Sequence, residues 1–144
     1  MDEFMSAAIE QARIGLAEGG LPIGSVLVKN NLIVGRGHNR RVQDRDPVAH
    51  AEIDCLRNAG RIGGYGGAVL YSTLTPCFMC AGAAIQFGIR KIVIGDIETY
   101  ADTLDFLKAH GIEVVGLKLA ACIQMLADFA AKNPELWKED SGDL

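Results

Sequence analysis

The sequence predicts an α/β protein, a three-layer αβα sandwich around a central five-stranded mixed sheet. Three observations support this fold class. Apolar stretches of strand length alternate with segments of helical periodicity along the chain. Two strand-like stretches follow one another near the N-terminus, which indicates an antiparallel hairpin beside otherwise parallel strands. The 144 residues, 49% of them hydrophobic, suffice for one domain spanning 1–144, with no visible linker or repeat.

The first third of the chain is predicted to form a helix, a hairpin and a second helix. A first helix is indicated by apolar residues that share one helical face: Met5, Ala8, Ile9, Ala12 and Leu16. Gly19 and Gly20 end it. The apolar segments 23–29 and 32–36 flank Asn30-Asn31, a pattern typical of a hairpin. The second helix is expected over 49–58.

The middle of the chain is predicted to be strand, helix and strand. Glycines crowd residues 60–67 without a phosphate-binding spacing, so this segment is interpreted as a connecting loop. A strand is expected over 68–73 and a helix over 77–87, closed by Gly88. Another strand is expected over 91–95.

The C-terminal part is predicted to add a helix over 104–110, the fifth strand over 112–117 and two further helices. The first of these two is indicated by an apolar stripe: Leu119, Ile123, Leu126 and Ala130. Asn133 is expected to cap the last helix, which begins at Pro134. We expect this last segment, 133–144, to act as a helical lid.

Composition and charge narrow the possible partners. The net charge of −4 disfavours a nucleic-acid partner, whose phosphates require a strongly basic surface. The first residues lack the features of a signal peptide, and no apolar run approaches the ~20 residues of a membrane span. Four cysteines suggest metal ligands or free thiols in a reducing compartment, so we expect a cytoplasmic protein without a membrane partner.

Two short motifs carry chemistry, His50-Ala51-Glu52 and Pro76-Cys77-Phe78-Met79-Cys80. Each follows a loop and opens a predicted helix, where free N–H groups and the helix dipole favour thiolates. Cys77 and Cys80 are three residues apart, so both can face one point from the first turn. With His50 they offer one nitrogen and two sulfurs, a suitable ligand set for Zn²⁺.

Three protein ligands leave the fourth tetrahedral position of zinc open for water, as catalysis requires. Zinc lowers the pKa of bound water to about 7, which provides hydroxide at neutral pH. Glu52 lies two residues from His50 and is the candidate catalytic acid and base that carries protons to the leaving amine. The combination H-x-E with P-C-x-x-C is the pattern of zinc nucleobase deaminases.

Simpler interpretations explain the two motifs less completely. A redox pair of cysteines would need neither His50 nor Glu52, and a structural zinc site would need a fourth ligand. Cys55 points away from the face of His50, and Cys122 falls on an apolar helix stripe. His38 and His110 are interpreted as structural histidines.

The chain resembles the cytidine deaminase-like superfamily and, within it, the small fungal-type cytosine deaminases. The likeness runs along nearly the whole chain. Besides the two motifs it rests on five segments: Glu18–Gly24 (EGGLPIG), Gly35–Asn39 (GRGHN), Asn58–Arg61 (NAGR), Leu74–Cys77 (LTPC) and Trp137–Asp140 (WKED). The Gly-His-Asn and C-terminal pieces favour a free-base enzyme that converts cytosine to uracil with release of ammonia, a reaction of pyrimidine salvage.

The resemblance implies roles for individual residues. Zinc would be bound by His50, Cys77 and Cys80, and protons would be carried by Glu52. The base would be held by hydrogen bonds from Asn39 and to Asp140, with Trp137 packed over it. Ile23 would line the floor of the pocket. A homodimer is implied as well.

Two positions depart from the fungal-type pattern and leave other substrates open. Ala51 replaces a glycine, as in the RNA adenosine and guanine deaminases, and Tyr100 stands where a phenylalanine would meet the substrate. Guanine, isocytosine or another small amino-substituted ring are therefore alternatives, as is tRNA adenosine. Arg40, Arg41 and Arg45 could meet phosphate, although a solvated loop is the simpler interpretation. A zinc-binding module without turnover is the remaining alternative.

Overall fold

The structure is a computed structural model that describes residues 2–143, so the last residue of the predicted lid lies outside the described residues. Along the chain it contains helices and strands in this order: α1 (Glu3–Ala17), β1 (Gly24–Lys29), β2 (Leu32–His38), α2 (Arg41–Asp44), α3 (Ala51–Ala59), β3 (Ala68–Leu74), α4 (Phe78–Phe87), β4 (Lys91–Asp96), α5 (Leu104–Ala109), β5 (Glu113–Gly116), α6 (Ala120–Lys132) and α7 (Pro134–Ser141).

The strands form the predicted five-stranded mixed sheet, in the order β2-β1-β3-β4-β5. β1 is antiparallel to both β2 and β3, whereas β3, β4 and β5 run parallel. The β1–β2 connection is the predicted hairpin. Asn30 and Asn31 both have positive φ, 53° and 63°, which is the conformation that a two-residue hairpin turn with the twist of the strands requires.

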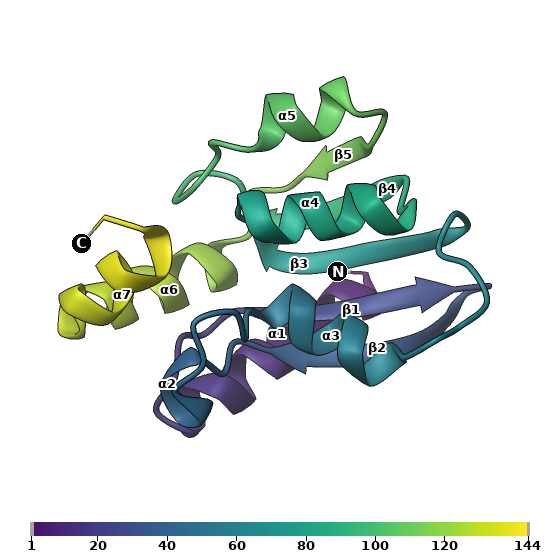
Figure 1. Ribbon diagram of the computed structural model, residues 1–144. Coiled ribbons are helices and arrows are strands. Elements are labelled where there is room, and N and C mark those ends of the chain that lie inside the picture. Colours follow the sequence, from purple (N-terminus) through teal and green to yellow (C-terminus); the bar gives the residue numbers. More distant parts are fainter. Residues whose placement is uncertain (1, 144) are drawn as a thin grey trace.

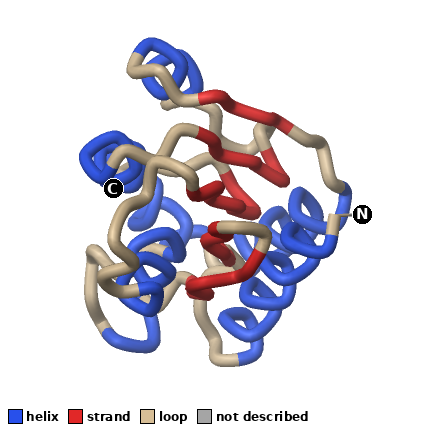
Figure 2. Tube along the Cα trace, turned by 90° about the vertical axis from the view of Figure 1, so that its right-hand side faces the viewer, coloured by secondary structure: helices blue, strands red, loops and turns tan. Residues whose placement is uncertain are grey.

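Helices cover both faces of the sheet, as Figures 1 and 2 show, so the three-layer prediction is confirmed. Alternate side chains of the strands point to opposite layers. On β1, Leu27 packs in the core shared with α3, α4 and α5, and its neighbours Val26 and Val28 pack against α1 and α6. Burial of both sheet faces explains why the inner strands β1, β3 and β4 are largely continuous buried runs, whereas the edge strands β2 and β5 keep exposed positions.

Two glycines of β2 allow α3 to lie unusually close to the sheet. A Cβ atom at Gly37 would come within 2.3 Å of the Cys55 backbone nitrogen, and one at Gly35 within 2.7 Å of the Cys55 carbonyl oxygen. The Asp54 carboxylate then accepts a hydrogen bond from the His38 backbone N–H at 3.0 Å. This close packing fixes the helix whose first turn carries His50 and Glu52.

The strand directions bring four distant segments to one edge of the sheet. Because β1 is antiparallel to its two neighbours, its start lies beside the end of β2, with Gly24 paired to His38. The parallel strands β3 and β4 also end at this edge. Residues just outside these strand ends, Ile23, Asn39, Cys77 and Tyr100, therefore approach one another although they are far apart in sequence.

Three details differ from the sequence-based expectations. The helical turn α2 was missed because it is only four residues long and ends at Arg45 in the left-handed conformation. Asn133 occupies the N-cap position of α7, but its side chain donates to the Phe129 carbonyl of α6 instead of capping α7. The fifth strand is shorter than predicted, from Glu113 to Gly116. Within residues 2–143, no helix combines the length and apolar character needed to span a membrane.

Candidate active site

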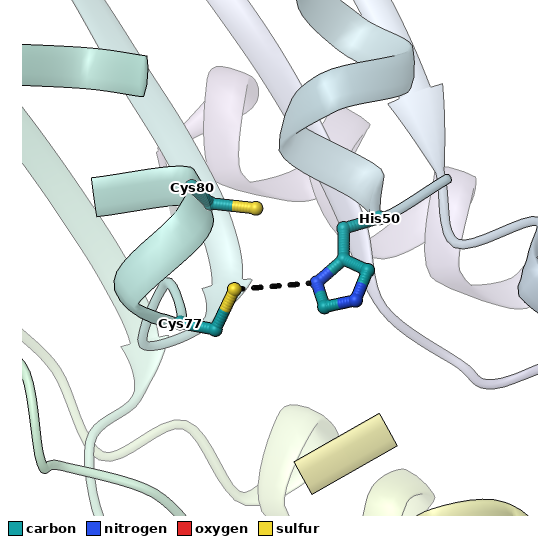
Figure 3. A group of neighbouring side chains, drawn as sticks. All are labelled: His50, Cys77 and Cys80. Carbon is teal, nitrogen blue, oxygen red and sulfur yellow. Dashed lines mark hydrogen bonds between the residues drawn. The ribbon is translucent and has the colours of Figure 1, made fainter. Parts of the chain in front are cut away.

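The three predicted metal ligands meet at the start of two helices. His50 is the N-cap residue of α3, Cys77 is the N-cap residue of α4, and Cys80 lies in the first turn of α4. Figure 3 shows their side chains pointing toward one common space between the two helices. Both helix starts direct free backbone N–H groups and positive dipole ends at this space, which favours thiolate over thiol.

The spacing of these atoms fits a zinc ion. The ligand atoms of His50, Cys77 and Cys80 all lie within 4.8 Å of one another, and Cys77 Sγ is 3.4 Å from His50 Nδ1. Tetrahedral zinc with bonds of ~2.0–2.3 Å separates its ligand atoms by roughly 3.5–4 Å. One imidazole and two thiolates with a fourth position free is the donor set of a catalytic zinc site.

The three ligand side chains shift one another's pKa values. A hydrogen bond from Cys80 and a second one with His50 together lower the pKa of the Cys77 thiol to about 4, against the opposing effect of burial. Burial alone would lower the pKa of His50, but the hydrogen bond to Cys77 and the charges of Asp140 and Glu52 raise it to about 9. Cys77 is thus a thiolate at neutral pH, the form that binds metal, whereas His50 and Cys80, whose pKa values are raised, would each release a proton when zinc binds.

Glu52 lies beside the ligands without being one of them. Its side chain is buried in the first turn of α3 and lines the same cavity as His50 and Cys77. Burial raises the pKa of the Glu52 carboxyl to about 7, and the charge of Cys77 contributes in the same direction. A carboxyl group with a pKa near the working pH can both accept and release a proton, which is the property of an efficient general acid and base.

The cavity over the ligands measures about 420 Å³ when the solvent at its mouth is included, and every predicted substrate residue lines it. Its lining consists of Ile23, Asn39, His50, Glu52, Leu74, Thr75, Cys77, Tyr100, Trp137, Asp140 and Ser141. Cys80 is not part of this lining. Leu74, Thr75 and Ser141 were not predicted; the first two directly precede Pro76-Cys77, which could have pointed to them, whereas no pattern marked Ser141.

Asn39 and Asp140 form one polar edge of the cavity, although 101 residues separate them. Asn39 Nδ2 donates to Asp140 Oδ1 at 3.0 Å, and Asn39 Oδ1 accepts from the Arg41 backbone N–H at 3.0 Å. Asp140 Oδ1 also lies 3.7 Å from His50 Nε2. Among residues 2–143, no hydrogen bond engages Asp140 Oδ2, so this oxygen remains available to a ligand.

Tyr100 sits on the loop after β4, which is held by buried polar contacts. The Asp96 carboxylate accepts hydrogen bonds from the backbone N–H groups of Glu98 and Thr99. At the end of the same loop, Thr103 Oγ1 donates to the Pro76 carbonyl at 2.6 Å, directly before Cys77. The loop that carries Tyr100 is therefore tied to the loop that carries a metal ligand.

The remaining cysteines and histidines have structural surroundings, as predicted. Cys55 and Cys122 are buried free thiols in the two core layers. His38 is buried, and its ring contacts Glu18 Oε1 at 2.8 Å. His110 ends α5, where its Nδ1 lies 2.9 Å from the Phe106 carbonyl oxygen.

The arginines before the site behave differently from one another. Arg40 pairs with Asp44 at 2.9 Å within α2, and Arg45 is exposed. The interpretation of a solvated loop is wrong for Arg41, whose side chain is only 10% exposed and points toward α7. No local sequence pattern distinguishes Arg41 from its neighbours.

Comparison with known proteins agrees with this geometry. Residues 1–96 match the family described as the cytidine and deoxycytidylate deaminase zinc-binding region. A cytosine deaminase of Candida albicans is 37% identical over 142 residues, which cover 96% of this chain and 95% of the relative. A tRNA-specific adenosine deaminase of Haemophilus influenzae is 35% identical over 93% of this chain and 85% of its own.

Solved structures give the same picture. A guanine deaminase from Nitrosomonas europaea superposes with a TM-score of 0.73 at 28% sequence identity. The superposition covers 89% of this chain and 83% of the guanine deaminase. Similar proteins therefore include enzymes named for three different amino-substituted bases.

Proposed function

The chain belongs to the cytidine and deoxycytidylate deaminase zinc-binding family, and on that premise we propose that it deaminates a free base, cytosine, to uracil. Membership makes the chain a zinc-dependent hydrolase that cleaves a C–N bond of a cyclic amidine. The observation that carries the choice of a free base is the position of α7. This helix brings Trp137 and Asp140 into the cavity lining, and the Asp140 side chain is only 7% exposed.

The polar edge of the cavity matches one edge of cytosine. Asn39 Nδ2 can donate to the ring carbonyl oxygen at C2, and Asp140 Oδ2 can accept from the neighbouring ring N1–H. With that edge bound, the amino-bearing C4 on the opposite side of the ring would face Glu52 and the metal ligands. A nucleoside carries its sugar on N1, so it lacks the N–H and would leave Asp140 buried without its partner.

Each residue then has a distinct role in the proposed reaction. Zinc bound to His50, Cys77 and Cys80 would activate water for attack on the ring. The Glu52 carboxylate would take a proton from that water and deliver it to the amino group, which leaves as ammonia. Trp137, the only tryptophan of the chain, would cover the ring and exclude solvent, with Ile23 on the floor. Water and cytosine thus give uracil and ammonia, and the reaction consumes no cofactor.

Two alternative substrates are supported by the names of similar proteins. The similarity to a guanine deaminase supports a purine base, and the Tyr100 hydroxyl, absent from phenylalanine, offers the cavity an additional hydrogen-bonding group. The similarity to tRNA-specific adenosine deaminases supports a nucleic-acid substrate. Against that alternative stand the net charge of −4 and the coverage of the cavity by α7.

A substrate panel tests the proposal directly. We expect kcat/KM for cytosine to exceed that for cytidine by roughly 10⁴-fold, because a site built around a substrate N–H rejects analogues that lack it. The measurement is ammonia release from cytosine, isocytosine, guanine, cytidine and an adenosine-containing tRNA stem-loop. Removing the residues after Asn133 is the control, since the truncated protein should lose the discrimination against cytidine.

Three outcomes of the panel would contradict parts of the proposal. Efficient deamination of cytidine or the stem-loop by the parent would refute the inference that α7 covers the cavity and excludes larger substrates. Guanine as the preferred substrate would retain the covered cavity and overturn the choice of base. No ammonia from any compound would favour a zinc-binding module without turnover.

We further propose that the protein is a homodimer and resides in the cytoplasm. Met79, Ala83 and Phe87 form a stripe along α4, and Met79 and Phe87 are 38% and 50% exposed. Ile53 and Leu56 of the adjacent α3 extend this apolar surface, which a second copy could cover by two-fold symmetry. The four free cysteines are compatible with a reducing compartment.

The oligomeric state is open to a simple measurement. Light scattering should give twice the mass of the 15.4 kDa chain, and Phe87→Glu should shift it toward a single chain. The single-chain mass for the parent at micromolar concentration would contradict the dimer.

A further inference from the structure

We propose that Arg41 is a positioning residue that holds α7 over the cavity and so keeps Asp140 and Trp137 in place over a free base. We call the contacts of the Arg41 side chain with Glu139 and Asp140 the latch. The inference rests on the proposed function, because it assigns a task to α7 in substrate selection. It arises from a side chain that no sequence motif marked. Arg41 opens the short helix α2, far from α7 in sequence, and is nearly enclosed at their junction.

The contacts of Arg41 connect three parts of the site. Its Nη2 lies 3.5 Å from Glu139 Oε1, and its Nη1 lies 3.7 Å from Asp140 Oδ1, so two of the three carboxylates of α7 face the guanidinium group. Its Nε donates to the Pro47 carbonyl at 3.3 Å, in the loop that leads to His50. A planar guanidinium group can engage these partners at once, which a lysine could not do.

The backbone of Arg41 acts on the same site. Its N–H donates to Asn39 Oδ1, and this leaves the Asn39 amide nitrogen directed at Asp140. One residue therefore orients Asn39 through its backbone and restrains Asp140 through its side chain. The two groups proposed to bind the edge of the base are both held by Arg41.

The polar contacts of Arg41 matter because α7 buries few apolar side chains of its own. None of the residues of α7 is fully buried, whereas α6 buries Cys122, Leu126 and Phe129. Leu136 and Trp137 are only half-buried against the core beneath the cavity. Besides this partial apolar packing, the ion pairs of Arg41 and the Asn39–Asp140 hydrogen bond tie α7 to the segment that follows β2. Arg41 also provides the positive charge that the enclosed Asp140 carboxylate needs.

Trp137 makes the latch measurable without any substrate. It is the only tryptophan of the chain and lies on α7, so tryptophan emission, excited at a wavelength that tyrosine does not absorb, reports on this helix alone. We expect Arg41→Gln to increase acrylamide quenching of Trp137 and to shift its emission to longer wavelength. Arg40→Gln is the matched control, because Arg40 pairs with Asp44 inside α2 and does not contact α7.

Kinetics provide the second measurement. In Arg41→Gln we expect KM for cytosine to rise roughly tenfold or more while kcat changes less, since the variant loses binding and not the proton carrier. The preference for cytosine over cytidine should fall as well. Arg41→Lys should restore only part of both properties, and Glu139→Gln, at an exposed carboxylate, should show a smaller effect of the same sign.

The outcomes separate the latch from the proposed substrate. Unchanged quenching and KM in Arg41→Gln, with zinc content and folding preserved, would overturn the latch. If Arg41→Gln fails to fold, unchanged quenching in both Arg41→Lys and Glu139→Gln would overturn it. A parent enzyme that prefers another base would refute cytosine, but increased quenching confined to the Arg41 and Glu139 variants would still support the latch.

Discussion

Glu52→Gln is expected to lower turnover by at least ~10²-fold while the protein keeps its zinc, because the amide cannot accept and return a proton. The substitution preserves the size of the side chain in a buried position. Since Glu52 is not one of the three clustered ligand residues, metal content should stay at the parental level. The measurements are kcat from ammonia release and zinc content of the purified variant.

Asp54→Asn is the matched control for this prediction. Asp54 lies two residues later on α3, and its carboxylate accepts the His38 backbone N–H instead of facing the cavity. An asparagine oxygen can still accept that hydrogen bond, so this variant should turn over nearly as the parent does. Parental turnover in Glu52→Gln would refute the role of Glu52, and loss of its zinc would show that the residue supports the metal instead.

Periodicity and turn chemistry were sufficient to predict the architecture. The alternation of apolar strands with amphipathic helices gave the mixed sheet and its layers, and Asn30-Asn31 gave the hairpin. The sequence contains Gly35 and Gly37, but it does not show why glycine is needed at these two positions. Glycine is needed there because α3, which follows β2 by twelve or more residues, packs directly on it. A local sequence pattern cannot reveal a contact between segments so far apart.

The metal ligands were predictable because their chemistry restricts both residue type and spacing. His50 and Glu52 share one helical turn, as do Cys77 and Cys80, so each pair is a local motif. The contact between Asn39 and Asp140 is different, since it joins residues that lie 101 positions apart in the sequence. Family resemblance suggested both residues, but the enclosure of Arg41 between them follows only from tertiary packing.

Cys77→Ala is expected to remove both metal and activity. The substitution leaves His50 and Cys80, and two ligands hold zinc far more weakly than three. It also removes the thiolate that pairs with His50, whose Nδ1 lies 3.4 Å from Cys77 Sγ. We expect the parent to carry one zinc ion per chain, and the variant to carry almost none after dialysis. Metal analysis and ammonia release are the two measurements.

Cys122→Ala separates this effect from the general loss of a buried thiol. Cys122 is also buried and free, but it lies in the core layer against α1, outside the cavity lining. Its replacement creates a small void and should lower stability slightly while zinc and turnover persist. Because metal binding is coupled to folding, a chelator should lower the melting temperature of the parent and of Cys122→Ala, but not that of Cys77→Ala. Full zinc occupancy in Cys77→Ala would overturn the ligand assignment, since no third ligand in the described cluster could replace the missing sulfur.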